Sequence, residues 1–242
     1  VLFRSLLQDF VKKQEVSKDY QAIFDINQLK EIIQQIEKAG LVSLDTETDN
    51  PSPLRARLVG LSLAIEPGKA FYLPLGHDYI GAPPQIPKEE ALNLLQPIFM
   101  NPEIRKIGQN IKYDFIVLKR EGIKLEGIDL DTMILSYLLE PNWGKHSLDK
   151  IALHYLQETT IPYEEVAGKG KSARTLNAVP IEKVTAYSCQ DADLALRLSQ
   201  ILWPRVEQAG LARLYREIEQ PLIEVLAEME IWGVKVDREA LR

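Results

Sequence analysis

Hydrophobic residues in the first part of the chain recur with two different periods. Within residues 26–39 they recur every three or four positions, the spacing of one helical face, at Ile26, Leu29, Ile32, Ile33 and Ile36. Gly40 follows and is expected to end this helix. The apolar run over 41–46 then predicts a buried strand, and the weak alternation over 20–24 predicts a short edge strand. Residues 1–19 show no clear period and are interpreted as a linker.

Two further apolar runs follow the strand predicted over 41–46. Residues 58–65 and 69–73 are strand-like, and Glu66-Pro67-Gly68 between them is a turn signal. Together with 41–46 they predict three consecutive, mainly antiparallel strands.

The rest of the chain is mostly helical in pattern. Apolar spacing predicts helices over 88–100, 110–120, 133–139, 146–156, 180–201 and 211–231. A short strand is expected at Lys106 and Ile107, and Asp131 is interpreted mainly as the N-cap of the helix over 133–139. A new element is expected to begin at Gly233 and the first residue is Val1, so we expect a fragment of a longer protein.

Composition excludes several classes of protein. With 45% hydrophobic and 26% charged residues among 242, the chain is typical of a globular protein, and it contains no apolar run long enough for a membrane span. A net charge of -6 argues against a broad basic surface for binding nucleic acid, but not against a local basic patch. The single Cys189 excludes an internal disulfide framework and a zinc-cysteine cluster, and it fits a reducing compartment.

The strand predicted over 41–46 ends in carboxylates. Side chains alternate between the two faces of a strand, so Asp45 and Glu47 point the same way. Two carboxylates at the mouth of a buried strand repel each other and are costly to desolvate, and a bound divalent cation relieves both costs. The alternative is a solvated acidic turn after the strand, which this stretch alone favours.

Two predicted helices carry an aspartate on an otherwise apolar face. Asp114 follows Ile111 by three positions, and Asp191 lies in the apolar stripe of 180–201 with Tyr187 one turn before it. An aspartate in an apolar stripe is rarely tolerated without a partner. For Asp191 the alternative is a buried carboxylate that is paired with an arginine or caps a neighbouring loop.

These carboxylates have no histidine or cysteine beside them at metal-ligand spacing, which favours hard cations such as magnesium or manganese. Two such ions can stabilise the attacking and the leaving oxygen of a phosphodiester displacement, and one of them lowers the pKa of a water molecule. Tyr187 is placed to orient that water. The pattern therefore indicates metal-dependent phosphodiester hydrolysis.

Other polar features have simpler interpretations. His146 and His154 are expected at surface or packing positions. The loop over 167–172 lacks the spacing of a Walker loop; its Lys169 and Lys171 either contact a nucleic-acid backbone or belong to a solvated flexible segment.

Three motifs carry a resemblance to a known family. They are Asp45-x-Glu47, Asn110-x-x-x-Asp114 and Tyr187-x-x-x-Asp191, which resemble the exonuclease motifs of the DEDD superfamily in its tyrosine branch. Further stretches resemble the 3′–5′ proofreading exonuclease domain of bacterial DNA polymerase I, family A, at 45–49, 58–62, 65–68, 108–110 and 167–171. The resemblance covers about residues 20–205, and 218–241 looks like the first helix of the polymerase domain.

The resemblance implies an α/β fold, a ribonuclease H-like mixed sheet flanked by helices. It implies a leader over 1–19, the exonuclease domain over 20–206 and the start of the polymerase domain over 207–242. It also assigns roles: two divalent ions, Mg²⁺ or Mn²⁺ with Zn²⁺ as an alternative at one site, would be held by Asp45, Glu47, Asp114 and Asp191. Tyr187 would align the water, and the terminal nucleotides would contact Thr48, Asn110, Tyr113 and Tyr163.

The implied function is proofreading by hydrolysis of DNA from its 3′ end, with release of nucleoside monophosphates. The implied partners are a single-stranded or frayed 3′ end and the remainder of the polymerase chain in cis, in a monomer of the bacterial cytoplasm associated with the nucleoid. An RNA-processing exonuclease of the same superfamily and an inactive structural DNA-binding domain are the alternatives. Pro51 departs from the family, because a leucine that wedges against the terminal base is common there; Leu54 is a candidate substitute.

Overall fold

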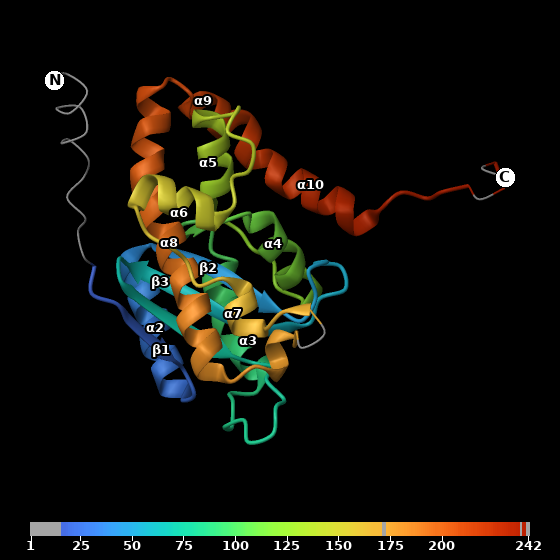
Figure 1. Cartoon of the computed structure of the whole chain (residues 1–242). Helices are drawn as coiled ribbons and strands as arrows, with labels where there is room; N and C mark the ends of the chain where they lie inside the picture. Colours follow the sequence, from blue (N-terminus) through green and yellow to red (C-terminus); the bar gives the residue numbers. More distant parts are fainter. Residues whose placement is uncertain (1–15, 171–172, 238, 241–242) are drawn as a thin grey trace.

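The computed structural model describes residues 16–170, 173–237 and 239–240, so most of the expected leader and Lys171 lie outside the described residues. One mixed sheet of six strands forms the centre of the molecule, in the order β1-β4-β3-β2-β5-β6 (Figure 1). The strands are β1 Asp19–Ala22, β2 Leu41–Thr48, β3 Leu58–Glu66, β4 Lys69–Pro74, β5 Arg105–Gly108 and β6 Ile128–Asp131.

The sheet joins an antiparallel half to a parallel half at β2. The pairs β2–β3 and β3–β4 are antiparallel, which confirms the three-strand prediction, and β1 is an edge strand parallel to β4. On the other side, β5 runs parallel to β2 and β6 parallel to β5. The carboxyl end of β2 therefore lies near the centre of the sheet, beside the end of β5.

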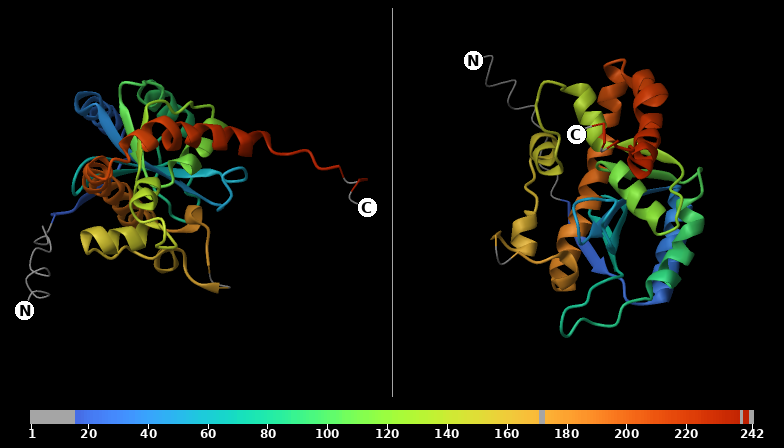
Figure 2. Two further views of the ribbon diagram at one scale, coloured as in Figure 1. Left: turned by 90° about the horizontal axis from the view of Figure 1, so that it is seen from above. Right: turned by 90° about the vertical axis from the view of Figure 1, so that its right-hand side faces the viewer.

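Helices cover both faces of the sheet, as expected. Helices α2 (Ile26–Ala39), α3 (Lys88–Phe99) and α4 (Ile111–Arg120) share one apolar core with Val42 and Leu44 of β2. The other face carries a second core, built on α8 (Ile181–Gln208) with α5 (Thr132–Leu139), α6 (Leu148–Leu156) and α7 (Tyr163–Ala167). The right-hand view of Figure 2 shows α2 and α8 on opposite sides of the sheet.

Helix ends follow the sequence signals closely. Asp25 caps α2 by accepting hydrogen bonds from the amides of Asn27 and Gln28, and Gly40 ends it in the left-handed conformation with φ of 63°. Asp131 caps α5 in the same way, as predicted. Helix α8 continues beyond the predicted Ile201 to Gln208.

Three features differ from the predicted elements. Strand β6 was not predicted, because four residues carry little periodicity and the pairing with β5 decides their conformation. Helix α7 was not predicted either. The helix expected over 211–231 is divided into α9 (Ala212–Leu214), a π-helical turn (Tyr215–Glu219) and α10 (Gln220–Trp232), and Pro221, which has no amide to donate, lies at the start of α10.

The C-terminal helix lies along the helix that carries Asp114. Figure 1 shows α10 beside α4, and ion pairs join Lys112 to Glu230 and Lys119 to Glu228. Tyr215, just before α10, is fully buried in the second core. Among the described residues, no helix combines the length and apolar character needed to cross a membrane.

Candidate active site

A cavity of about 350 Å³ opens at the carboxyl end of β2. Every residue that the sequence pattern or the resemblance assigned to the site lines it: Asp45, Glu47, Thr48, Asn110, Tyr113, Asp114, Tyr163, Tyr187 and Asp191. They come from β2, from α4 and its N-cap, from α7 and from α8. The fold thus brings together residues that are spread over most of the chain.

Three carboxylates form the centre of this cavity. Asp45 and Glu47 lie on the face of β2 that is covered by α8, and one oxygen from each lies within 4.8 Å of an oxygen of Asp191. Glu47 is only 6% exposed, so the two acidic residues of β2 are not a solvated turn. Its buried Oε1 has no hydrogen-bond partner in the described part of the chain. A buried anionic oxygen without a donor is costly, and a cation would satisfy it.

The raised pKa values of the three carboxyl groups also indicate that a nearby positive charge would stabilise their ionised forms. Burial, with repulsion from Asp191, raises the pKa of Glu47 to about 8. Burial also raises the pKa of Asp191 to about 7, and burial with repulsion from Glu47 raises that of Asp45 well above its usual value. The donor set consists of carboxylate oxygens only. These residues therefore fit a hard divalent cation.

Asp114 lies beside the three carboxylates but is oriented differently. It is 2% exposed on the first turn of α4, and its Oδ1 accepts hydrogen bonds from the amide and the hydroxyl of Thr46, each at 2.7 Å. Burial raises the pKa of Asp114 to about 7 although these two bonds lower it. The bonds fix α4 to β2 and leave Asp114 at the wall of the cavity.

Tyr187 and Asp191 lie one turn apart on α8 and both face the cavity. Burial, followed by the charges of Asp191 and Glu47, raises the pKa of Tyr187 strongly, so its phenol keeps its proton. A hydrogen bond from this phenol lowers the pKa of Asp191. The arginine partner considered for Asp191 belongs instead to Asp193, which is fully buried and accepts from Arg197 at 3.4 Å.

The residues expected to contact nucleotides surround these acids. The hydroxyls of Thr48 and Tyr113 lie 2.5 Å apart, and Tyr113 also donates to the carbonyl oxygen of Asn50 at 2.8 Å. Tyr163 is 48% exposed and its ring meets that of Tyr187 edge-on, with centroids 6.3 Å apart. Asn110 has a φ of 56°, an uncommon conformation for a residue other than glycine.

Sequence reasoning missed several residues that shape the cavity. Gln109 and Leu176 line it, and Thr46 orients Asp114. Thr46 and Gln109 had a signal, because they lie in the stretches 45–49 and 108–110 that resemble the family, whereas Leu176 had none. At the position of the expected wedge, Pro51 lines the cavity, whereas Leu54 is 42% exposed outside it.

His146 and His154 lie where the sequence suggested. His146 is buried against the hydroxyl of Ser136, and His154 is exposed beside Glu140. Lys169, in the basic loop, forms an ion pair with Glu164.

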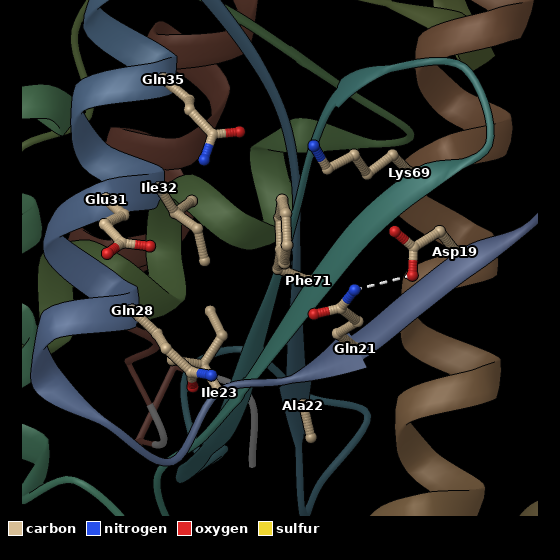
Figure 3. Close-up of a pocket in the computed structure, with 10 residues that line it drawn as sticks. All are labelled: Asp19, Gln21, Ala22, Ile23, Gln28, Glu31, Ile32, Gln35, Lys69 and Phe71. Atoms are coloured by element: carbon tan, nitrogen blue, oxygen red, sulfur yellow. Dashed lines mark hydrogen bonds between the residues drawn. The ribbon is translucent and has the colours of Figure 1, made fainter.

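A second cavity of about 280 Å³ lies far from this cluster, between α2 and the sheet edge formed by β1 and β4. Figure 3 shows polar side chains of α2 (Gln28, Glu31 and Gln35) and of the two strands (Asp19, Gln21 and Lys69) around Phe71 and Ile32. Its Asp19 accepts a hydrogen bond from Gln21. This cavity lacks the converging carboxylates of the first.

In the metal-free protein we expect the free energy of unfolding to decrease as the pH rises from about 6.5 to about 8.5. The pKa of Glu47, Asp114 and Asp191 is raised in the native state, which therefore binds more protons than the unfolded chain in this range. Each proton that the native state binds in excess of the unfolded chain lowers the free energy of unfolding by about 1.4 kcal/mol for every unit by which the pH rises.

Urea unfolding in EDTA at the two ends of this pH range measures the effect. Magnesium added at the alkaline end should restore stability, because it binds the native state only. An unfolding midpoint that is higher at the alkaline end in EDTA would contradict the electrostatics described above.

The chain is similar in sequence to known bacterial DNA polymerases. The chain is 39% identical to DNA polymerase I of Pseudomonas aeruginosa over 226 residues, which is 92% of this chain and 25% of that protein. It is 40% identical to DNA polymerase I of Rhizobium leguminosarum over 239 residues, which is 92% of this chain and 23% of that protein. The chain thus spans about a quarter of the length of these relatives.

Solved structures confirm the ribonuclease H-like fold. Brucella melitensis NrnC superimposes with a TM-score of 0.67 at 19% identity, over 90% of this chain and 94% of that one. Residues 20–207 match the family model described as 3′-5′ exonuclease. This range spans the part of the chain that lines the cavity, and the chain therefore belongs to the 3′–5′ exonuclease family found in DNA polymerases of the A type.

Proposed function

We propose that the cavity at the end of β2 hydrolyses DNA from its 3′ end, one nucleoside monophosphate at a time, and that the chain is the proofreading part of a DNA polymerase I. The observation that carries this proposal is the convergence of three carboxylates within 4.8 Å, beside a protonated tyrosine, in a single cavity. The likeness to bacterial polymerases supports DNA as the substrate.

In this proposal Asp45, Glu47 and Asp191 would hold one divalent ion, and Asp45 with Asp114 would hold a second. When bound, such ions supply positive charge that lowers the pKa of the attacking water and stabilises the departing 3′ oxygen. Mg²⁺ or Mn²⁺ suits the carboxylate donors, with Zn²⁺ as an alternative at one site. Packing of α8 against β2 holds Asp45, Glu47 and Asp191 in place, and hydrogen bonds from Thr46 hold Asp114.

The remaining residues act on the substrate and the water. Tyr187 keeps its proton, so its phenol can donate or accept a hydrogen bond and orient the attacking water toward the terminal phosphodiester. Tyr163 offers an exposed ring for base stacking. Thr48, Tyr113 and Asn110 line the cavity and seat the terminal nucleotides.

We also propose that residues 207–242 begin the polymerase domain, after a leader over 1–19 and the exonuclease domain over 20–206. The side of α10 that does not contact α4 exposes apolar side chains, among them Val225, Met229 and Trp232, which suits a segment covered by further chain. The polymerase remainder would be the partner in cis of a monomer in the bacterial cytoplasm, near the nucleoid.

Matched DNA and RNA oligonucleotides of one sequence test the proposed substrate. The purified chain with magnesium should shorten the DNA from its 3′ end and should be inactive in EDTA. Faster shortening of the RNA would favour an RNA-processing exonuclease, and no hydrolysis of either would favour a structural DNA-binding role.

We expect single-stranded or frayed 3′ ends to be degraded faster than fully paired ends. The terminal phosphodiester must reach acids that lie inside a cavity, and a paired end must first open at a cost of a few kcal/mol. Initial rates on single-stranded, blunt and mismatched 3′ ends of otherwise equal sequence measure this preference. Equal rates on all three substrates would contradict it.

A further inference from the structure

One carboxylate outside the cavity holds the start of the helix that carries Asp114. Asp131 is 1% exposed, and it accepts hydrogen bonds from the amides of Asn110 at 3.1 Å and of Ile111 at 2.8 Å. It also accepts from the amides of Met133 and Ile134 at the start of α5. A single side chain therefore fixes the first turns of α4 and α5. Asn110 is the N-cap of α4, and Tyr113 and Asp114 lie on its first turn.

The bond to Asn110 occurs where the backbone is under constraint. Asn110 adopts the left-handed conformation, although it is not a glycine, and such residues persist when their surroundings hold them there. Its side chain makes no capping bond to α4. The carboxylate of Asp131 supplies the acceptor that α4 would otherwise lack at its first amides.

Asp131 is in turn held by a tyrosine from the C-terminal part of the chain. The hydroxyl of Tyr215 accepts from the amide of Asp131 at 2.8 Å and donates to the carbonyl oxygen of Asp129 at 3.1 Å. Tyr215 is fully buried, and its ring packs against Trp203 with centroids 5.5 Å apart. Tyr215 lies beyond residue 207, where the match to the exonuclease family ends.

We propose that Asp131 and Tyr215 are positioning residues for the exonuclease, and that the segment from Tyr215 onward is needed for full activity of a site it does not touch. Tyr215 fixes the backbone of Asp131, Asp131 fixes the first turn of α4, and that turn places Tyr113 and Asp114 in the cavity. The proposal rests on the proposed function for its catalytic consequence, but its structural consequence can be measured without activity.

The substitution Tyr215→Phe tests this connection, because it removes one hydroxyl and keeps the ring. Tyr155→Phe is the matched control: Tyr155 is also a buried tyrosine, and its hydroxyl donates to Glu140 at the end of α5. Tyr215→Phe should slow DNA hydrolysis by about 5- to 10-fold and raise the magnesium concentration for half-maximal rate, which is less than the roughly 10- to 100-fold typically lost when a group bonded to a metal ligand is removed. Asp131 bonds to the first amides of α4 itself and is therefore one step closer to Asp114 than Tyr215 is. Asp131→Asn should therefore have the larger effect.

Hydrogen exchange in the metal-free protein gives the independent readout. The amides of residues 110–114 should exchange faster in Tyr215→Phe than in the wild type or in Tyr155→Phe, while both variants show similar unfolding temperatures. Unchanged exchange in α4, or equal rates and equal magnesium dependence in the two phenylalanine variants, would overturn the inference. An inactive wild type with faster exchange in Tyr215→Phe would overturn the proposed function and leave the structural connection standing.

Discussion

Replacement of Asp45 by alanine is expected to lower the rate of 3′-end hydrolysis by more than about 1,000-fold, beyond the loss usually seen when one charge-stabilising donor is removed. An oxygen of Asp45 lies within 4.8 Å of oxygens of Glu47 and Asp191, and burial together with the charges of Glu47, Asp114 and Asp191 raises the pKa of Asp45. In the proposed mechanism Asp45 would be the ligand shared by both ions. Steady-state release of mononucleotides from single-stranded DNA measures the effect.

The same variant should fold normally. Asp45 is a half-buried carboxylate among other carboxylates, so its removal relieves repulsion in the metal-free protein. At alkaline pH in EDTA, its unfolding temperature should equal or exceed that of the wild type. Asp19→Ala is a matched control, because Asp19 is an exposed aspartate on strand β1 outside the candidate site, and its activity should be unchanged. An Asp45→Ala protein that unfolds much earlier, or that keeps near-normal turnover, would show that Asp45 has a structural role only.

The second large effect is expected at Tyr187, which shares a face of α8 with Asp191 but has a different role. Tyr187→Phe keeps the ring and its packing against Tyr163 and removes the hydroxyl. The rate should fall by roughly 10- to 1,000-fold, the range in which orienting and proton-handling groups usually act. The metal dependence should change only slightly, through loss of the hydrogen bond to Asp191.

The metal dependence of Tyr187→Phe is to be compared with that of Asp191→Asn. A neutral amide is a poorer ligand for a hard dication, so this variant should require far more metal for half-maximal rate. Additional manganese should partly restore Asp191→Asn and should not restore Tyr187→Phe. If Tyr187→Phe is instead the variant that manganese restores, or if neither substitution slows hydrolysis, the roles proposed for this helix are wrong.

Much of the fold could be predicted because the pattern of apolar residues is locally strong. Helix α2 has the predicted bounds, with Asp25 and Gly40 at its ends, and the antiparallel strands are separated by the expected turn. Strand β6 could not be predicted, because its four residues become a strand only through pairing with β5. The interruption before α10 also escaped prediction, since apolar spacing continues through a π-helical turn almost unchanged.

The candidate site, like the fold, could be predicted from the sequence only in part. Alternation along β2 was sufficient to place Asp45 and Glu47 on one face of the strand, and helical spacing in α8 placed Asp191 on the inward face of its helix; the structure brings their oxygens together. The orientation of Asp114 toward Thr46 depends on how α4 meets the sheet, which no local pattern contains. Asp131 was interpreted as a helix cap, and the structure confirms the cap, but its bonds to the start of α4 join residues that are 20 positions apart or more.

The central claim is that this cavity removes nucleotides from the 3′ end of DNA with the help of its carboxylates. A single-stranded DNA labelled at its 5′ end, incubated with the wild-type chain and magnesium, tests it most directly. We predict a ladder of labelled products that shorten one nucleotide at a time, and no products with EDTA or with Asp45→Ala. Early release of a labelled mononucleotide from the 5′ end, internal cuts, or equal degradation by the Asp45→Ala preparation would contradict the claim.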